Sequence, residues 1–198
     1  MSRPLKRKKK PNRSSLLDLA WNHLTAGRWD EAEQLYRNLL VHTPQDPALL
    51  HFLGIIAHQR GQPEQAITWI SKAVAIHPGF AEAHNNLGLA LEGVQRWHEA
   101  ASSYRRALAL QPRLAASHNN LGNVLRQQGT PGEAIACFHQ ALTLQPDYFQ
   151  AYNNLGNAHA DLGQWDEAIA CYQKALTLNP HFTEAHRKGS HRFLLHAD

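Results

Sequence analysis

The sequence predicts an all-α solenoid in which five two-helix repeats stack on one another, and three observations carry this prediction. A six-residue motif, AHNNLG at residues 83–88, returns as SHNNLG at 117–122 and AYNNLG at 151–156, each time 34 residues later. Two stretches with helical apolar spacing, separated by a glycine turn, fill each interval. A fixed period of this length is the signature of repeat architectures. Prolines recur at the same interval as Pro44, Pro78, Pro112, Pro146 and Pro180.

The first helix of each repeat is predicted from small and apolar residues at helical spacing. If the late proline is numbered position 32, these residues fall at positions 4, 7, 8 and 11. Glycine within a helix costs about 1 kcal/mol relative to alanine, so glycine at position 8 indicates close approach of a second helix. The residues at position 8 are Ala20, Gly54, Gly88, Gly122 and Gly156. The repeats themselves are 13–46, 47–80, 81–114, 115–148 and 149–182.

A turn is predicted at position 15, where four of the five repeats have glycine, which readily takes positive φ beyond a helix end. The third repeat has Gln95 there and Gly93 two residues earlier, so we expect an altered turn in that repeat. The second helix then opens at position 17, where Pro63 and Pro131 suit the first helical position. Acidic residues follow in the first turn of each second helix and stabilise its positive end.

The second helix is predicted to supply the large residue of the core. Position 20 is always alanine, and position 24 holds a bulky side chain. A large residue flanked by small ones at helical spacing indicates an interlocking core rather than a cofactor site. The proline at position 32 then ends the helix. The bulky residues at position 24 are Tyr36, Ile70, Tyr104, Phe138 and Tyr172.

Together, the L-G-x-x pattern, the A-x-x-x-Y pattern and a late proline at a period of 34 resemble the tetratricopeptide repeat. The resemblance covers residues 13–182. It implies a right-handed α-α superhelix of five repeats in which the first helices line a concave groove. A sixth repeat begins at 183–186 and departs from the pattern at Gly189. Residues 183–198 are therefore expected to form a partial sixth helix that caps the stack, unless the chain is the front part of a longer protein.

The formal charge of +4 is concentrated at the N-terminus, because seven of the 20 Lys and Arg residues lie within residues 1–13. The other 13 face 16 acidic residues, so the rest of the chain, residues 14–198, carries a formal −3. Residues 1–13 are predicted to be a disordered basic tail. Three roles remain open for this tail: improving solubility, contacting nucleic acid or an anionic surface, or nuclear localisation in a cell with a nucleus. Its charged cluster is Lys6, Arg7, Lys8, Lys9 and Lys10.

Neither a catalytic motif nor a metal or cofactor motif is found in the sequence. Cys137 and Cys171 occupy equivalent places in neighbouring repeats, too far apart for a disulfide, and are interpreted as free, buried apolar residues. His84 and His118 are likewise one repeat apart, much farther than two ligands of one metal ion. There is no apolar run of membrane-spanning length and no secretory signal, so we expect a cytoplasmic protein.

Asparagines within the first helices are the candidate binding residues. Asparagine in a helix costs up to about 0.7 kcal/mol relative to alanine, so eight of them call for compensation. Positions 2, 5, 9, 12 and 13 form a stripe opposite the core positions, and in the tetratricopeptide repeat this stripe lines the groove. The pattern resembles the asparagine ladder in the repeat domain of O-linked N-acetylglucosamine transferase. The candidates are Asn85, Asn86, Asn119, Asn120, Asn123, Asn153, Asn154 and Asn157.

Two roles remain open for these asparagines. Each amide offers both a donor and an acceptor, so a column of them could bind the backbone of an extended peptide. Alternatively, they bond neighbouring helices and keep the repeats in register. The lysine and arginine clamp of repeats that grip chaperone C-termini is absent, since its columns hold residues such as Ala48, Glu82 and Ala116.

The sequence thus favours a non-catalytic protein-protein interaction scaffold that binds a protein or peptide. The alternative is the substrate-recruiting N-terminal region of a larger, glycosyltransferase-like enzyme. In a third interpretation the basic tail brings the solenoid to nucleic acid or to an anionic membrane.

Overall fold

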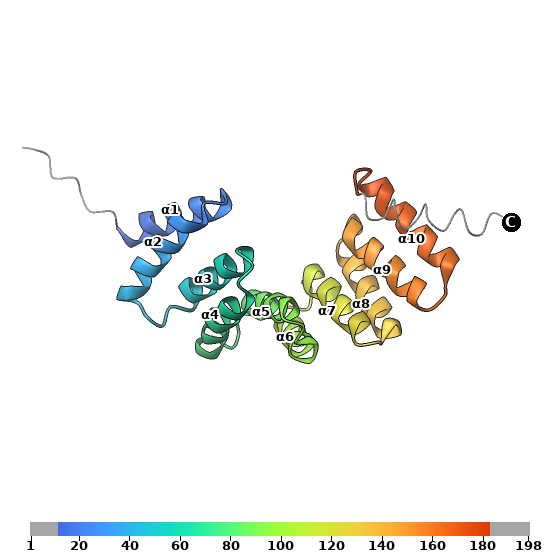
Figure 1. Ribbon diagram of the computed structural model, residues 1–198, viewed down its shortest axis with the longest axis horizontal. Helices are drawn as coiled ribbons and strands as arrows, with labels where there is room; N and C mark the ends of the chain where they lie inside the picture. Colours follow the sequence, from blue (N-terminus) through green and yellow to red (C-terminus); the bar gives the residue numbers. More distant parts are fainter. Residues whose placement is uncertain (1–11, 183–198) are drawn as a thin grey trace, which may run out of the picture. The chain divides into compact units, whose positions relative to one another are not determined.

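The computed structural model describes residues 12–182, which form ten α-helices and no strand (Figure 1). The all-α prediction is confirmed for this part of the chain. The helices fall into two compact units, residues 1–78 (unit 1) and residues 79–198 (unit 2). The sequence predicts a disordered basic tail at residues 1–13, and all but the last two of these residues lie outside the described part of the chain. The predicted partial sixth helix also lies outside it.

Unit 1 contains two helix pairs whose successive helices pack against each other. The four helices are α1 (Arg13–Thr25), α2 (Trp29–His42), α3 (Pro47–Gln59) and α4 (Pro63–Ile76). The core is built around Tyr36, which is 1% exposed, together with small and aliphatic residues of α1, α2 and α3. The Phe52 ring stacks on the Tyr36 ring with a centroid distance of 5.0 Å.

Unit 2 contains three helix pairs, in which each second helix packs on its own first helix and, where another repeat follows, on the first helix of that repeat. The six helices are α5 (Ala81–Gly93), α6 (Trp97–Leu110), α7 (Ala115–Gln127), α8 (Pro131–Leu144), α9 (Phe149–Asp161) and α10 (Trp165–Leu178). The first helices also contact one another directly, α5 with α7 and α7 with α9. This direct contact brings equivalent side chains of successive repeats together.

Proline and capping residues set the helix boundaries as the sequence predicts. Each second helix ends two residues before the proline at position 32. In the fourth and fifth repeats the intervening residue, Gln145 or Asn179, is extended, which is the conformation that a following proline favours. Pro63 and Pro131 occupy the first helical position. At the start of α3, Asp46 accepts hydrogen bonds from the backbone N–H groups of Ala48 (3.0 Å) and Leu49 (3.3 Å).

The glycine at position 8 makes the predicted close approach to the large residue at position 24. A Cβ added to Gly122 would lie 2.6 Å from the Phe138 ring, and one added to Gly88 would lie 2.6 Å from the Tyr104 ring. Both distances are shorter than van der Waals contact. Glycine is therefore required there by the bulk of its partner.

Cys137 and Cys171 are free, but they are half-buried rather than buried as the sequence suggested. Both stand at position 23, beside the fully packed position 24, so their side chains point toward the edge of the core. Burial raises the pKa of the Cys137 thiol, and it raises the pKa of the Cys171 thiol to about 11. Both thiols are accordingly protonated at neutral pH.

The turn of the third repeat corrects the sequence-based expectation. Gln95 takes φ = 59°, close to the 69° to 80° of the glycines Gly61, Gly129 and Gly163 at the same position. Its flanking hydrogen bonds are also the same, with Arg96 N bonded to Leu91 O at 3.0 Å as Thr130 N is to Leu125 O. The turn is not altered, because the packing of α5 on α6 imposes it on a residue for which this conformation is strained.

This strain leads to a prediction for Gln95→Gly. We expect the substitution to stabilise the chain by about 0.5–1 kcal/mol, because a left-handed backbone costs a non-glycine residue roughly 1–2 kcal/mol and the added freedom of the unfolded chain offsets part of the gain. Urea denaturation followed by circular dichroism would measure it. Gln95→Ala keeps the strain and should leave stability nearly unchanged. A lower midpoint for Gln95→Gly would contradict this explanation.

Candidate functional site

All eight candidate asparagines lie in unit 2, on the first helices α5, α7 and α9. These helices contact one another in sequence order, so positions 5 and 6 of each repeat come near positions 5 and 6 of the next. Unit 1 does not continue the column, because His51 and Phe52 occupy the two positions on α3. The site is therefore a feature of unit 2 alone.

Six of the amides form one continuous chain of hydrogen bonds, which we call the amide ladder. Between repeats, Asn154 Nδ2 donates to Asn119 Oδ1 at 3.0 Å, and Asn120 Nδ2 donates to Asn85 Oδ1 at 3.4 Å. Within each helix the amide at position 5 donates to the amide at position 6, at 3.2 Å in α5, 3.3 Å in α7 and 3.4 Å in α9. The ladder consists of Asn85, Asn86, Asn119, Asn120, Asn153 and Asn154.

The two positions of the ladder differ in burial on α7 and α9, whereas Asn85 and Asn86 on α5 are both half-buried. Asn119 and Asn153, at position 5, are 5% and 3% exposed, so they do not face an open groove as the helical wheel suggested. The direct packing of first helix on first helix covers them. Asn120 and Asn154, at position 6, are half-buried. Because each uses one N–H and one lone pair within the ladder, each retains one N–H donor and one acceptor site.

The ladder is open at its C-terminal end. Asn153 Oδ1 is buried and has no hydrogen-bond partner among the described residues. The equivalent oxygens of Asn85 and Asn119 each accept a bond from position 6 of the following repeat. The unpaired oxygen thus marks where one more repeat would continue the pattern.

The two candidates at position 9 lie apart from the ladder and differ from each other. Asn157 is 8% exposed and accepts a hydrogen bond from the Tyr172 hydroxyl at 3.0 Å, which ties α9 to α10. Asn123 is half-buried on α7, and no side-chain hydrogen bond is found for it among the described residues. Asn123 is therefore the candidate whose amide is least committed to holding the fold.

Sequence reasoning missed Ser117, whose hydroxyl donates to Asn85 Oδ1 at 2.8 Å and so reinforces the ladder between α7 and α5. Ser117 is 1% exposed, and it stands where the neighbouring repeats have Ala83 and Ala151. The sequence does contain one sign of this contact, because a serine replaces the alanine found at the same position in both neighbouring repeats.

A second polar contact that sequence reasoning missed joins Glu92 on α5 to Tyr104 on α6. The Tyr104 hydroxyl donates to the Glu92 carboxylate. Burial raises the pKa of Glu92, and this hydrogen bond opposes part of that rise. Burial likewise raises the pKa of Tyr104, with a contribution from the nearby carboxylate. Arg126 on α7 forms an ion pair with Asp161 on α9 at 3.3 Å. This polar edge of α5, α7 and α9 carries both signs of charge.

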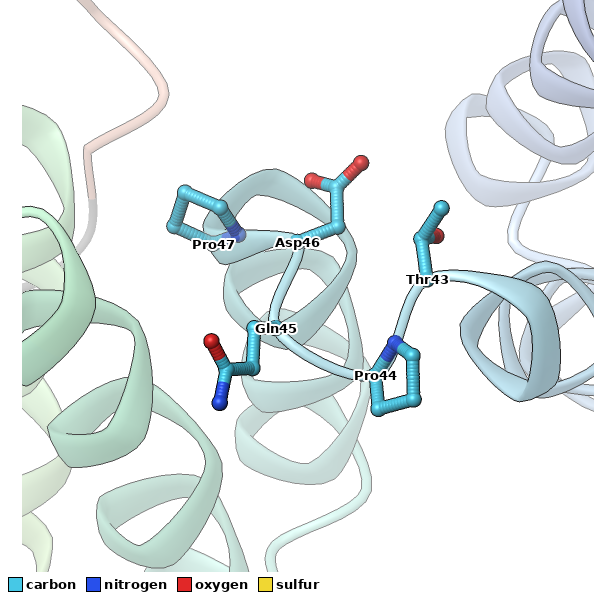
Figure 2. Close-up of a pocket in the computed structure, with 5 residues that line it drawn as sticks. All are labelled: Thr43, Pro44, Gln45, Asp46 and Pro47. Carbon is cyan, nitrogen blue, oxygen red and sulfur yellow. The ribbon is translucent and has the colours of Figure 1, made fainter.

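Unit 1 has an open depression of about 650 Å³ at the turn between α2 and α3, formed by residues 43–47 (Figure 2). Among the described residues that line it, the ionisable one is Asp46. The Asp46 carboxylate already caps α3 and forms an ion pair with Arg13.

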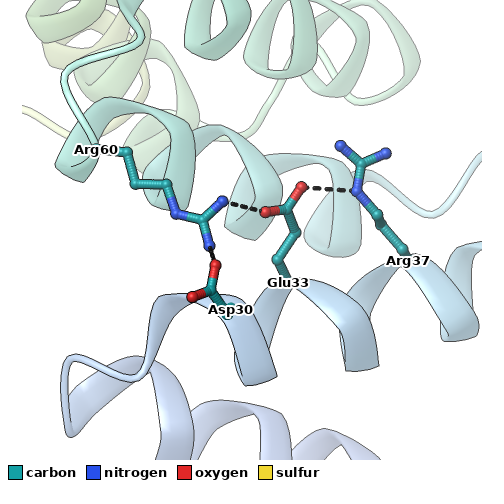
Figure 3. A network of polar contacts seen from close by, with 4 residues as sticks. All are labelled: Asp30, Glu33, Arg37 and Arg60. Carbon is teal, nitrogen blue, oxygen red and sulfur yellow. Dashed lines mark hydrogen bonds and ion pairs between the residues drawn. The ribbon is translucent and has the colours of Figure 1, made fainter.

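An ion-pair network joins the first two repeats within unit 1 (Figure 3). Glu33 on α2 accepts a hydrogen bond from Arg37 Nε at 2.7 Å and pairs with Arg60, which follows α3 and also pairs with Asp30. Burial alone would raise the pKa of Glu33, but Arg37 and Arg60 together outweigh it and hold that pKa below its usual value. The network stabilises the packing of α3 on α2.

The described residues contain no cluster of His, Cys, Asp or Glu side chains that could hold a metal ion. None of the helices within residues 12–182 is long and apolar enough to cross a membrane.

Comparison with known proteins identifies related sequences and structures. Sequence models of the tetratricopeptide repeat match residues 17–81, 95–129, 122–163 and 149–182. The crystal structure of MamA is 28% identical, covers 84% of this chain and 98% of its own, and has a TM-score of 0.74. TTC0263, a thermophilic TPR protein in Thermus thermophilus, is 26% identical, with 92% and 100% covered and a TM-score of 0.74. YrrB, a TPR protein with an unusual peptide-binding site, is 17% identical, with 90% and 92% covered and a TM-score of 0.73, a likeness of fold alone.

Proposed function

Because the chain belongs to the tetratricopeptide-repeat family, we propose that it is a non-catalytic interaction scaffold whose amide ladder binds the backbone of an extended peptide from a partner protein. The observation that carries the proposal is the continuous hydrogen-bonded chain of amides across α5, α7 and α9. The hydrogen bonds of the ladder fix the orientation of each of its amides before a ligand binds.

Fixed orientation favours binding because a preorganised donor loses little freedom when the ligand is bound. Asn120 and Asn154 each retain an N–H that can donate to a peptide carbonyl, and each retains a lone pair that can accept a peptide N–H. First helices in contact lie roughly 8–10 Å apart, whereas an extended peptide advances about 3.3 Å per residue. The ladder would thus bind the backbone at about every third residue, whatever its side chains.

Specificity would come from the residues beside the ladder, which differ between repeats. Asn123 on α7 occupies the position of Leu89 on α5 and of Asn157 on α9. The charged residues Glu92, Arg126 and Asp161 lie near the C-terminal ends of the same three helices. A peptide with both acidic and basic side chains would fit this edge better than one with a single sign of charge.

The test is to capture partners from a lysate of the source cells with the wild-type chain and with the Asn86→Ala/Asn120→Ala/Asn154→Ala variant. Binding of a peptide from any captured partner is then measured with both purified chains. We expect the triple variant to lose the peptide while still melting cooperatively. Asn22→Ala/Asn38→Ala, which changes exposed asparagines of unit 1, is the matched control and should retain it.

A second variant separates loss of binding from loss of folding. Asn123→Arg places a bulky side chain beside the ladder without removing any ladder hydrogen bond, so the chain should stay folded and bind the peptide weakly. Undiminished binding by both Asn123→Arg and a folded triple variant would show that the ladder only holds the repeats in register.

A further inference from the structure

Unit 1 contains a second recessed surface, on helices that carry none of the candidate asparagines. It is an open groove of about 410 Å³ lined by α2 and α4, with one residue each from the turn after α2 and from α3. We call it the Trp69 groove, after the tryptophan that α4 contributes. Its principal lining residues are Arg37, Leu40, Val41, Leu50, Trp69 and Lys72.

Two cations lie against the Trp69 ring. The Arg37 guanidinium carbon is 5.4 Å from the ring centroid, and the Lys72 ammonium nitrogen is 5.2 Å from it. The Lys72 side chain is exposed, and among the described residues it forms no ion pair. Arg37 uses its Nε for Glu33, and Figure 3 shows its two terminal nitrogens directed away from that contact. The groove therefore presents one cation, Lys72, without an ion pair among the described residues, and a second, Arg37, whose terminal nitrogens point away from its partner Glu33.

The rest of the groove is apolar. Leu50 is 2% exposed and forms part of the floor, and Leu40 is half-buried beside it. Val41 also lines the groove, and 74% of its surface is exposed. Apolar side chains beside two cations suit a ligand that combines an apolar side chain with negative charge.

Trp69 packs partly against the core of unit 1, but an aromatic residue is not required at its position. Position 23 holds Leu35, Ser103, Cys137 and Cys171 in the other four repeats, and all five repeats fold alike. Between α6 and α8, the place of Arg37 and Trp69 is taken by Arg105 and the Cys137 thiol, which are close enough to interact electrostatically. A small residue thus suffices at this position. The aromatic surface in repeat two is an addition to the scaffold.

We propose that the Trp69 groove is a second peptide-binding site, and that it binds an acidic segment of a partner protein in which carboxylates flank one aliphatic side chain. The aliphatic side chain packs on the Trp69 ring and Leu40. The carboxylates pair with Lys72 and with the terminal nitrogens of Arg37. This site is independent of the amide ladder, so either can exist without the other.

The experiment measures the affinity of the full-length chain for a fluorescein-labelled peptide in which glutamates flank one leucine, by fluorescence anisotropy. We expect Lys72→Gln to weaken binding about twofold to fivefold, the usual effect of losing an exposed charge pair. Trp69→Ala should weaken it about tenfold or more, because a central aromatic contact is lost, while Trp69→Phe should retain most of the binding. Added salt should weaken binding by the wild type.

Lys174→Gln is the matched control, because Lys174 is exposed and occupies in repeat five the position of Lys72, where Cys171 replaces the tryptophan. It should bind the peptide as the wild type does. Lys72 is exposed, so Lys72→Gln tests the proposal even if Trp69→Ala fails to fold. The proposal is overturned if the wild type does not bind the peptide, if Lys72→Gln behaves like Lys174→Gln, or if a peptide with lysines in place of the glutamates binds equally well.

Discussion

Phe138→Ala is expected to destabilise the chain by about 3–5 kcal/mol, the usual cost of truncating a fully buried phenylalanine. Phe138 on α8 is 0% exposed, and its ring lies against the backbone of α7 at Gly122. Since two helices close on this ring, the space that it leaves cannot collapse without separating them from their other contacts. Urea denaturation followed by circular dichroism would measure the loss. Leu162→Ala, at an apolar residue of the same unit that is 46% exposed, should cost far less.

The same contact can be tested from the glycine. Gly122→Ala should destabilise the chain by about 1–3 kcal/mol through overpacking, despite the better helix propensity of alanine. Gly132→Ala on α8 is the control, because a Cβ there meets nothing within 4 Å. In the double variant Gly122→Ala/Phe138→Leu the combined cost should be less than the sum of the two single costs, since the smaller side chain makes room for the methyl group. Strict additivity would show that the two residues do not interlock.

Asn119→Ala is expected to destabilise the chain by about 1–3 kcal/mol, because it leaves the partners of a buried amide without their hydrogen bonds. The Asn119 side chain accepts from Asn154 at 3.0 Å and donates to Asn120 at 3.3 Å, and it is 5% exposed. The substitution also improves helix propensity by up to about 0.7 kcal/mol, so the measured loss is a lower limit for the hydrogen bonds.

Asn123→Ala makes the control for this prediction, since it removes the same side chain from the same helix one turn later. Without a ladder bond to lose, Asn123→Ala should be neutral or slightly stabilising. Equal effects of the two substitutions on the urea midpoint would mean that the ladder contributes nothing to stability. A large difference would show that positions 5 and 6 serve the register of the repeats in addition to any role in binding.

The repeat architecture could be predicted from the sequence because it is set by local and periodic features. A proline lacks the N–H that a helix needs, so Pro112 predicted the end of a helix. Glycine is unfavourable within a helix unless a neighbour needs the space, so Gly122 at position 8 predicted a close contact. The asparagine column predicted correctly that something compensates for its poor helix propensity. The sequence left open whether the partner was a ligand or the next repeat.

Only the tertiary structure decided three matters, each of which depends on how neighbouring helices meet. Gln95 takes the glycine-like turn because the packing of α5 on α6 outweighs its own conformational preference. Asn119 is buried because first helices pack directly on each other, which a helical wheel of one isolated helix does not include. Arg37 lies against Trp69 because α2 and α4 bring together residues more than 30 positions apart. Periodicity thus determined the repeat, whereas contacts between repeats determined which side chains remain available to a partner.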